Sequence, residues 1–219
     1  MTTTLAHVVN PHAGLHAVTA DAYEVQAARR AAEASLREFP YYVERYGERG
    51  RMFGASDGAW LVTLCAGDRD YARRQVLWLG SVLSARGMPR LLLERHLELL
   101  HGELLRLTRD GDRCLPLLDA ALLLREMRHD HVPEREFAAA AAGFAHGGDA
   151  EWARRLPRMG DILVAAVADR AAGISNAVDA VTAWATDPSR FPPAWIADVQ
   201  RTLADARTRL REPLHGTTR

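Results

Sequence analysis

The sequence contains no lysine, because all 28 residues counted as lysine or arginine are arginine, and 28 acidic residues balance them. Without lysine the chain cannot form a Schiff base with a substrate, attach pyridoxal phosphate or supply the lysine of a phosphate-binding loop. The balanced charge gives no reason to expect an extended surface of one sign. We therefore expect no binding to nucleic acid and none to a membrane.

Cysteine is scarce and long apolar runs are missing. The two cysteines, Cys65 and Cys114, match no metal-binding spacing, and the chain begins without the charged and apolar segments of a secretory signal. We expect reduced, buried thiols in a cytoplasmic protein. The longest apolar run of the C-terminal half, Ile162 to Ala168, is far shorter than the ~18 residues of a membrane span.

Helical periodicity extends over almost the whole chain. Apolar residues recur in steps of three and four along residues 93–107, 163–181 and 196–210, and no segment alternates with a period of two. The second of these stripes predicts one long helix, which pairs with the third as a helical hairpin. The fold class that this pattern predicts is all-α.

Capping and breaking residues divide the chain. Asp21 is placed to cap a helix that runs to about Phe39, and Asp68 to cap another that Gly87 ends before Pro89 opens the next. Glycines at positions 47, 50 and 54 predict a break between these helices. We predict three parts: a flexible arm over residues 1–20, a helical domain over 21–146, and a C-terminal hairpin over 147–219.

One stretch of the chain resembles a known family. Residues 68–71 read Asp-Arg-Asp-Tyr, residues 79–83 read Leu-Gly-Ser-Val-Leu, and residues 87–89 read Gly-Met-Pro. The stretch is similar to the core of the sensor globins, the haem-binding domains of bacterial globin-coupled sensors. In that family an Asp-x-x-Tyr-like element leads into a helix ending Ile-Gly-x-x-His, which Gly-Leu-Pro follows. The resemblance implies a globin-like helical bundle to which the C-terminal hairpin is added.

The position of the iron-ligating histidine in that family is Leu83 here, and leucine has no lone pair for a metal. The nearest alternative ligands are His96 and His101, on the following helix. The resemblance therefore implies a haem-less module without a cofactor, similar to the amino-terminal domains of stressosome proteins. It also implies a vestigial pocket that a small apolar ligand such as a fatty acid could fill, lined by Trp60, Leu64, Tyr71, Leu79, Leu83 and Met88. The alternative is that bulky side chains have collapsed into this space.

The three apolar stripes are more than one small core needs, so we expect a homodimer in which one stripe is shared. The alternative is that the hairpin packs on its own helical domain and all three stripes are covered within one chain. Together these features favour a haem-less, globin-like sensor or protein-interaction module that acts with a signalling protein or a small ligand. We expect no catalytic residue and no metal site.

A metal-dependent helical enzyme is the alternative function. Two copies of the Glu-x-x-His spacing that ferritin-like bundles use end at His101 and His129, the second beginning at Glu126. The pair His129-Asp130, with His101 upstream and Asp169 downstream, loosely matches the order of ligands in HD-type phosphohydrolases. Against this alternative, the two motifs lie on consecutive helices, and His129 is close to a helix end that favours a capping role.

Overall fold

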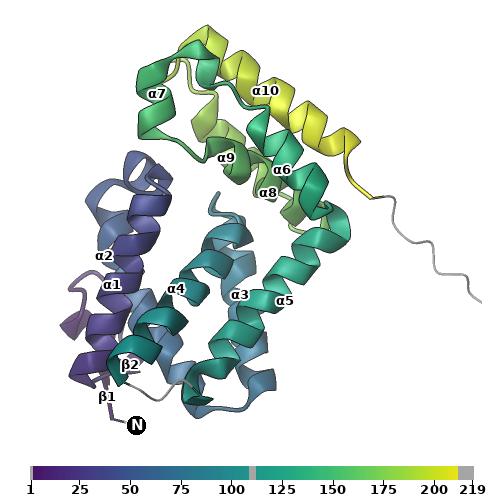
Figure 1. Cartoon of the computed structure of the whole chain (residues 1–219). Helices are drawn as coiled ribbons and strands as arrows, with labels where there is room; N and C mark the ends of the chain where they lie inside the picture. Colours follow the sequence, from purple (N-terminus) through teal and green to yellow (C-terminus); the bar gives the residue numbers. More distant parts are fainter. Residues whose placement is uncertain (1, 109–111, 212–219) are drawn as a thin grey trace, which may run out of the picture. The chain divides into compact units, whose positions relative to one another are not determined.

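The computed structural model describes residues 2–108 and 112–211, and within these ranges the prediction of an all-α protein is confirmed. Figure 1 shows the helices in order along the chain. The α-helices are α1 (Ala22–Glu38), α2 (Tyr41–Thr63), α3 (Arg69–Ser84), α4 (Arg90–Thr108), α5 (Leu115–His131), α6 (Glu134–Ala142), α7 (Ala150–Arg155), α8 (Met159–Ala171), α9 (Ala177–Ala185) and α10 (Pro193–Thr208). In the described part of the chain, no helix combines the length and apolar character needed to cross a bilayer.

The chain forms two compact units that are interleaved along the sequence. Among the described residues, the first unit contains 2–80, 92–108, 112–124 and 155–157, and the second contains 81–91, 125–154 and 158–211. The division into residues 1–20, 21–146 and 147–219 stays a prediction.

The first twenty residues hold the two short strands that the periodicity did not predict. Strands β1 (Thr3–Leu5) and β2 (Ala17–Thr19) pair antiparallel, with Thr3 opposite Thr19. Ala6 and Val18 have no exposed surface. Asp21 caps α1 as predicted, since its carboxylate accepts hydrogen bonds from the backbone N–H groups of Tyr23 and Glu24 at 2.9 and 3.0 Å. The segment is therefore tied to the first unit by burial and by the start of α1.

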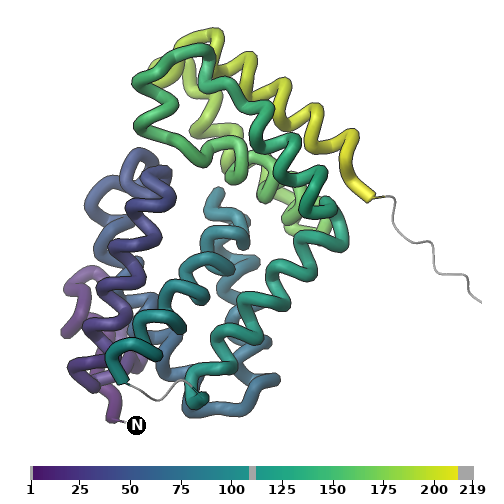
Figure 2. Tube along the Cα trace, in the orientation of Figure 1, coloured from purple at the N-terminus to yellow at the C-terminus, as the bar shows by residue number. Residues whose placement is uncertain are grey.

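Helices α1 and α2 lie side by side, as the tube in Figure 2 shows. Small residues make this possible: Ala27, Ala28 and Ala31 of α1 have no exposed surface, and Gly58 of α2 faces Ala28. The predicted break in α2 occurs at Gly47, whose φ of +60° lies in the left-handed region. The chain stays helical through Gly50, which lies against Tyr42 and Tyr46 of the same helix, and through Gly54, which faces Ala32 of α1.

The corner between α3 and α4 follows the prediction. Gly87 has a φ of +85° and ends α3, and α4 begins at Arg90, directly after Pro89. Residues 81–91, which include this corner, belong to the second unit.

The second unit is built around α8, where all residues from Met159 to Asp169 except Asp161 are buried. Helices α6, α9 and α10 pack on it. The structure divides the predicted long helix at Gly173, whose φ of +97° separates α8 from α9. Trp195 of α10 is fully buried, donates its indole N–H to the Ala185 carbonyl at 3.0 Å and stacks on Phe191 at 4.8 Å between ring centroids.

Candidate functional site

The six residues of the predicted pocket have different environments. In the first unit Leu64 is 1% exposed, Trp60 and Leu79 are half-buried, and Tyr71 is 42% exposed. In the second unit Leu83 and Met88 are half-buried. A pocket shared by these residues stays a prediction, and Tyr71 presents much of its ring to solvent.

His96 of α4 lies in a closely packed polar position inside the first unit. Its Nδ1 is 3.0 Å from the hydroxyl oxygen of Ser35 on α1. Its Nε2 faces Gly58 of α2 so closely that a Cβ at that position would lie 3.2 Å away. Burial lowers the pKa of His96 to about 4, so the ring is neutral at physiological pH. Since neither nitrogen faces open space, this position does not fit an axial ligand of haem.

The burial of His96 predicts a pH dependence of stability. Its pKa falls from 6.5 in the unfolded chain to about 4 in the folded chain, so the unfolded state binds the proton first and stability is lost as the pH falls through that window. Asp57 acts in the opposite sense, because burial raises its pKa from 3.8 to about 6 and favours the protonated folded state at low pH.

We therefore compare Asp57→Asn with Asp57→Asn/His96→Asn, in which the amide introduced on α4 can still bond Ser35 but does not titrate. Between pH 6.5 and pH 4, Asp57→Asn should lose up to about 3 kcal/mol more than the double variant in urea unfolding. Parallel pH profiles of the two proteins would show that His96 is not the titrating group.

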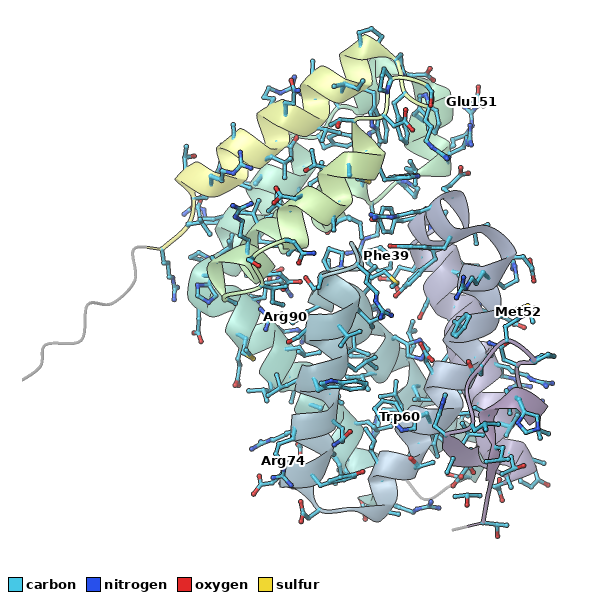
Figure 3. All side chains as sticks on the ribbon, turned by 180° about the vertical axis from the view of Figure 1, so that it is seen from behind. Phe39, Met52, Trp60, Arg74, Arg90 and Glu151 are labelled. Atoms are coloured by element: carbon cyan, nitrogen blue, oxygen red, sulfur yellow. The ribbon has the colours of Figure 1, made fainter. Side chains whose placement is uncertain are left out.

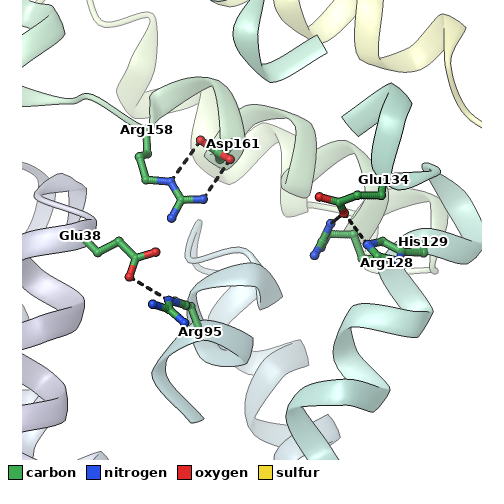
Figure 4. Close-up of polar contacts among 7 residues, drawn as sticks. All are labelled: Glu38, Arg95, Arg128, His129, Glu134, Arg158 and Asp161. Atoms are coloured by element: carbon green, nitrogen blue, oxygen red, sulfur yellow. Dashed lines mark hydrogen bonds and ion pairs between the residues drawn. The ribbon is translucent and has the colours of Figure 1, made fainter. Parts of the chain in front are cut away.

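The residues of the metal-enzyme alternative do not form the site that it needs. In residues 2–108 and 112–211, no group of three or more His, Cys, Asp or Glu side chains could hold a metal ion. His129 is 2.6 Å from the Glu134 carboxylate, which also pairs with Arg128 at 3.3 Å, as Figure 4 shows. Asp130 and Glu126 are exposed. His129 thus joins an ion-pair network between the end of α5 and the start of α6, and His101 lies in the first unit on α4.

A buried charged cluster in the second unit involves a residue of that same alternative, Asp169. Its carboxylate accepts from the backbone N–H and the Nε of Arg90 at 2.8 and 2.7 Å, and from the Ser84 hydroxyl at 2.6 Å. Asp169 and Arg90 are 2% and 5% exposed. Since the first residue of α4 receives its cap from α8, Asp169 holds the α3–α4 corner in place and does not act as a metal ligand.

A solvent-exposed surface of α3, which we call the α3 face, brings two aromatic side chains and an arginine together. It consists of Tyr71, Arg74 and Trp78, which are three and four positions apart and so project from one side of the helix. Tyr71 and Trp78 are 42% and 59% exposed. Figure 3 labels Arg74 on the outside of α3, and Trp60 on the neighbouring helix α2.

Contacts with α2 and with the residues just before α3 hold the two aromatic rings of the α3 face in place. Trp60 meets Trp78 edge to face, with ring centroids 6.5 Å apart at an interplanar angle of 71°. The Tyr71 ring lies over Gly67, where a Cβ would be 2.8 Å from the ring. Asp68 caps α3 at the same place by accepting from the Tyr71 N–H at 2.6 Å. The face is therefore positioned before any partner binds, which lowers the entropic cost of binding.

Arg74 gives the α3 face its positive charge. Arg74 is exposed, and within the described residues it makes no ion pair. Arg69, one turn earlier, is instead paired with Asp119 at 3.1 Å. Exposed aromatic residues next to arginine are typical of the centre of protein interfaces. The sequence interpretation placed Tyr71 and Trp60 in a pocket and did not single out Trp78, although its spacing of seven from Tyr71 is visible in the sequence.

No protein-family model, no curated protein and no solved structure matches this chain. Function has to be inferred from its own residues.

Proposed function

We propose that the protein is a non-catalytic, haem-less, globin-like sensor or interaction module that docks an acidic protein segment on its α3 face. The resemblance over residues 60–89 supports the globin-like part of the proposal. The observation that supports the docking part is the exposed pair Trp78 and Arg74, with Tyr71 on the same side of α3.

The partner follows from the chemistry of the face. The exposed Arg74 attracts carboxylates over a distance and helps to fix the orientation of the complex. Trp78 and Tyr71 bury large apolar areas at a small loss of side-chain entropy, so they act as anchors for an apolar or aromatic side chain of the partner. The matching partner is a segment in which Asp or Glu residues flank such a side chain.

A second copy of the chain matches this face less well. In a symmetric pairing both subunits use the same surface, so residues near the two-fold axis meet their own copies. Arg74 lies between Tyr71 and Trp78 and would face Arg74 of the second copy, which is unfavourable for two exposed charges of the same sign.

The proposal is tested by selecting peptides from a random library on the full-length protein. The peptides that bind should be enriched in Asp and Glu around an aromatic or large apolar residue. In fluorescence titrations the affinity of these peptides should fall by about tenfold or more in each of two variants. Trp78→Ala removes the aromatic anchor, and Arg74→Glu reverses the charge beside it.

Matched controls separate this face from the rest of the surface. Tyr23→Ala removes an aromatic ring that is 62% exposed on α1, and Arg207→Glu reverses an exposed arginine on α10. Both variants should bind the selected peptides as the wild type does. Peptides that bind the controls and the α3 variants equally, or a preference for single-stranded oligonucleotides at this face, would overturn the proposal.

The homodimer and the apolar ligand remain predictions of the same module. The stripes that we expected to pair two chains are covered within one chain: Leu97, Leu100 and Leu104 have no exposed surface, and Val178 and Leu203 are 2% and 3% exposed. A dimer would thus have to use a surface other than these stripes.

A further inference from the structure

The two cysteines, 49 positions apart in the sequence, lie next to each other in the first unit. Cys65 belongs to the 3₁₀ helix η2 (Leu64–Ala66), and Cys114 ends the 3₁₀ helix η3 (Asp112–Cys114). These two short helices pack directly against each other. The thiols are hydrogen-bonded to one another and are 7% and 3% exposed. The sequence interpretation treated them as separate buried thiols, because spacing gives no sign of their contact.

We propose that Cys65 and Cys114 form a reversible disulfide that links η2 to η3. The step needs an oxidant, for which a low-molecular-weight disulfide suffices. One cysteine thiolate attacks a sulfur of that disulfide and releases the first small thiolate, which leaves a mixed disulfide on the protein. The second cysteine then attacks the mixed disulfide and releases the second small thiolate. In total, two cysteine thiols are oxidised, one small disulfide is reduced to two thiols, and the two protons pass to these products.

The surroundings of the two thiols slow their oxidation. The hydrogen bond with Cys114 and burial raise the pKa of the Cys65 thiol well above its ordinary value, while the nearby Arg113 acts in the opposite direction. Since the thiolate is the attacking species, oxidation is slow at neutral pH and faster at alkaline pH. The pair therefore responds to a sustained oxidising environment rather than to a brief one.

The bond would also restrain the chain. It joins the α2–α3 connection to the α4–α5 connection and closes a loop of 49 positions, which lowers the entropy of the unfolded chain. The contact between η2 and η3 and the hydrogen bond between the thiols already bring the two cysteines together.

The experiment treats the full-length protein with oxidised glutathione at alkaline pH. Intact-mass spectra should show the loss of two hydrogen atoms, and a non-reducing digest should yield one peptide pair linked through Cys65 and Cys114. The oxidised protein should melt roughly 5–10 °C higher than the reduced protein. Dithiothreitol should reverse the change.

Cys65→Ser and Cys114→Ser are the controls, and neither should show the rise in melting temperature. Stable mixed disulfides with glutathione, or disulfide-linked dimers in place of the internal bond, would overturn the proposal. So would two thiols that stay reduced in the folded protein although both react with iodoacetamide after unfolding. None of these outcomes depends on the α3 face, so this inference stands or fails separately from the proposed function.

Discussion

Replacing Asp169 with alanine is expected to reduce the free energy of unfolding by about 3–5 kcal/mol, the typical cost of removing one partner of a buried ion pair. The variant leaves the Arg90 guanidinium buried without its carboxylate, and it removes the acceptors of the Ser84 hydroxyl and of the first N–H of α4. Urea unfolding followed by far-ultraviolet circular dichroism measures the loss.

Asp161→Ala is the matched control, because it removes another arginine–aspartate pair on the same helix. Arg158 and Asp161 are 3.1 Å apart but 36% and 24% exposed, and Figure 4 shows this pair as well. An accessible pair of this kind contributes about 0–1 kcal/mol. Equal losses in the two variants would mean that burial of the Arg90–Asp169 pair has no energetic consequence.

Gly160→Ala is the second change with a large expected effect. A Cβ at this position of α8 would lie 2.2 Å from the backbone carbonyl oxygen of Ala141 at the end of α6. Backbone cannot move aside as a flexible side chain can, so the two helices must separate. We expect a loss of about 3 kcal/mol or more in the free energy of unfolding, at the upper end of what overpacking costs.

Gly102→Ala is the control for Gly160→Ala, because it makes the same substitution at an uncrowded position. Gly102 lies within α4, and a Cβ there meets nothing within 4 Å. Alanine should therefore stabilise the protein by roughly 0.5–1 kcal/mol through its better helix propensity. If Gly160→Ala is as stable as the wild type in the same thermal and urea unfolding series, the close crossing of α8 and α6 is wrong.

The sequence was sufficient to predict helix ends and turns that depend on residues within a few positions of one another. Asp21 and Asp68 cap helices, and Gly87 and Pro89 form a corner, because each acts within a few residues of its own position. The glycines of α2 show where such signals fail. A Cβ at Gly54 would lie 3.4 Å from the Ala32 Cβ, and one at Gly58 would lie 3.2 Å from that of Ala28. Tertiary packing against α1 thus overrides their tendency to break a helix.

Contacts between distant positions could not be predicted from spacing. Arg90 and Asp169, and likewise the two cysteines, come from different elements and meet only in the folded chain. One signal was available for the first pair: Asp169 directly follows the apolar run from Ile162 to Ala168, and an acid in a helix that is buried on all sides needs a partner. The exposure of Trp78 had no such signal, because an aromatic residue at helical spacing equally suits a core.

The docking of an acidic segment on the α3 face is tested most directly by photo-crosslinking in the cells that make the protein. Benzoylphenylalanine is placed at position 78 in one variant and at position 23 in another, since both positions are exposed aromatic residues. We expect one partner that crosslinks from position 78 and not from position 23, through a peptide rich in Asp and Glu. This crosslink should be lost when Arg74→Glu is added. Absence of a specific adduct at position 78, or the same adducts from both positions, would contradict it.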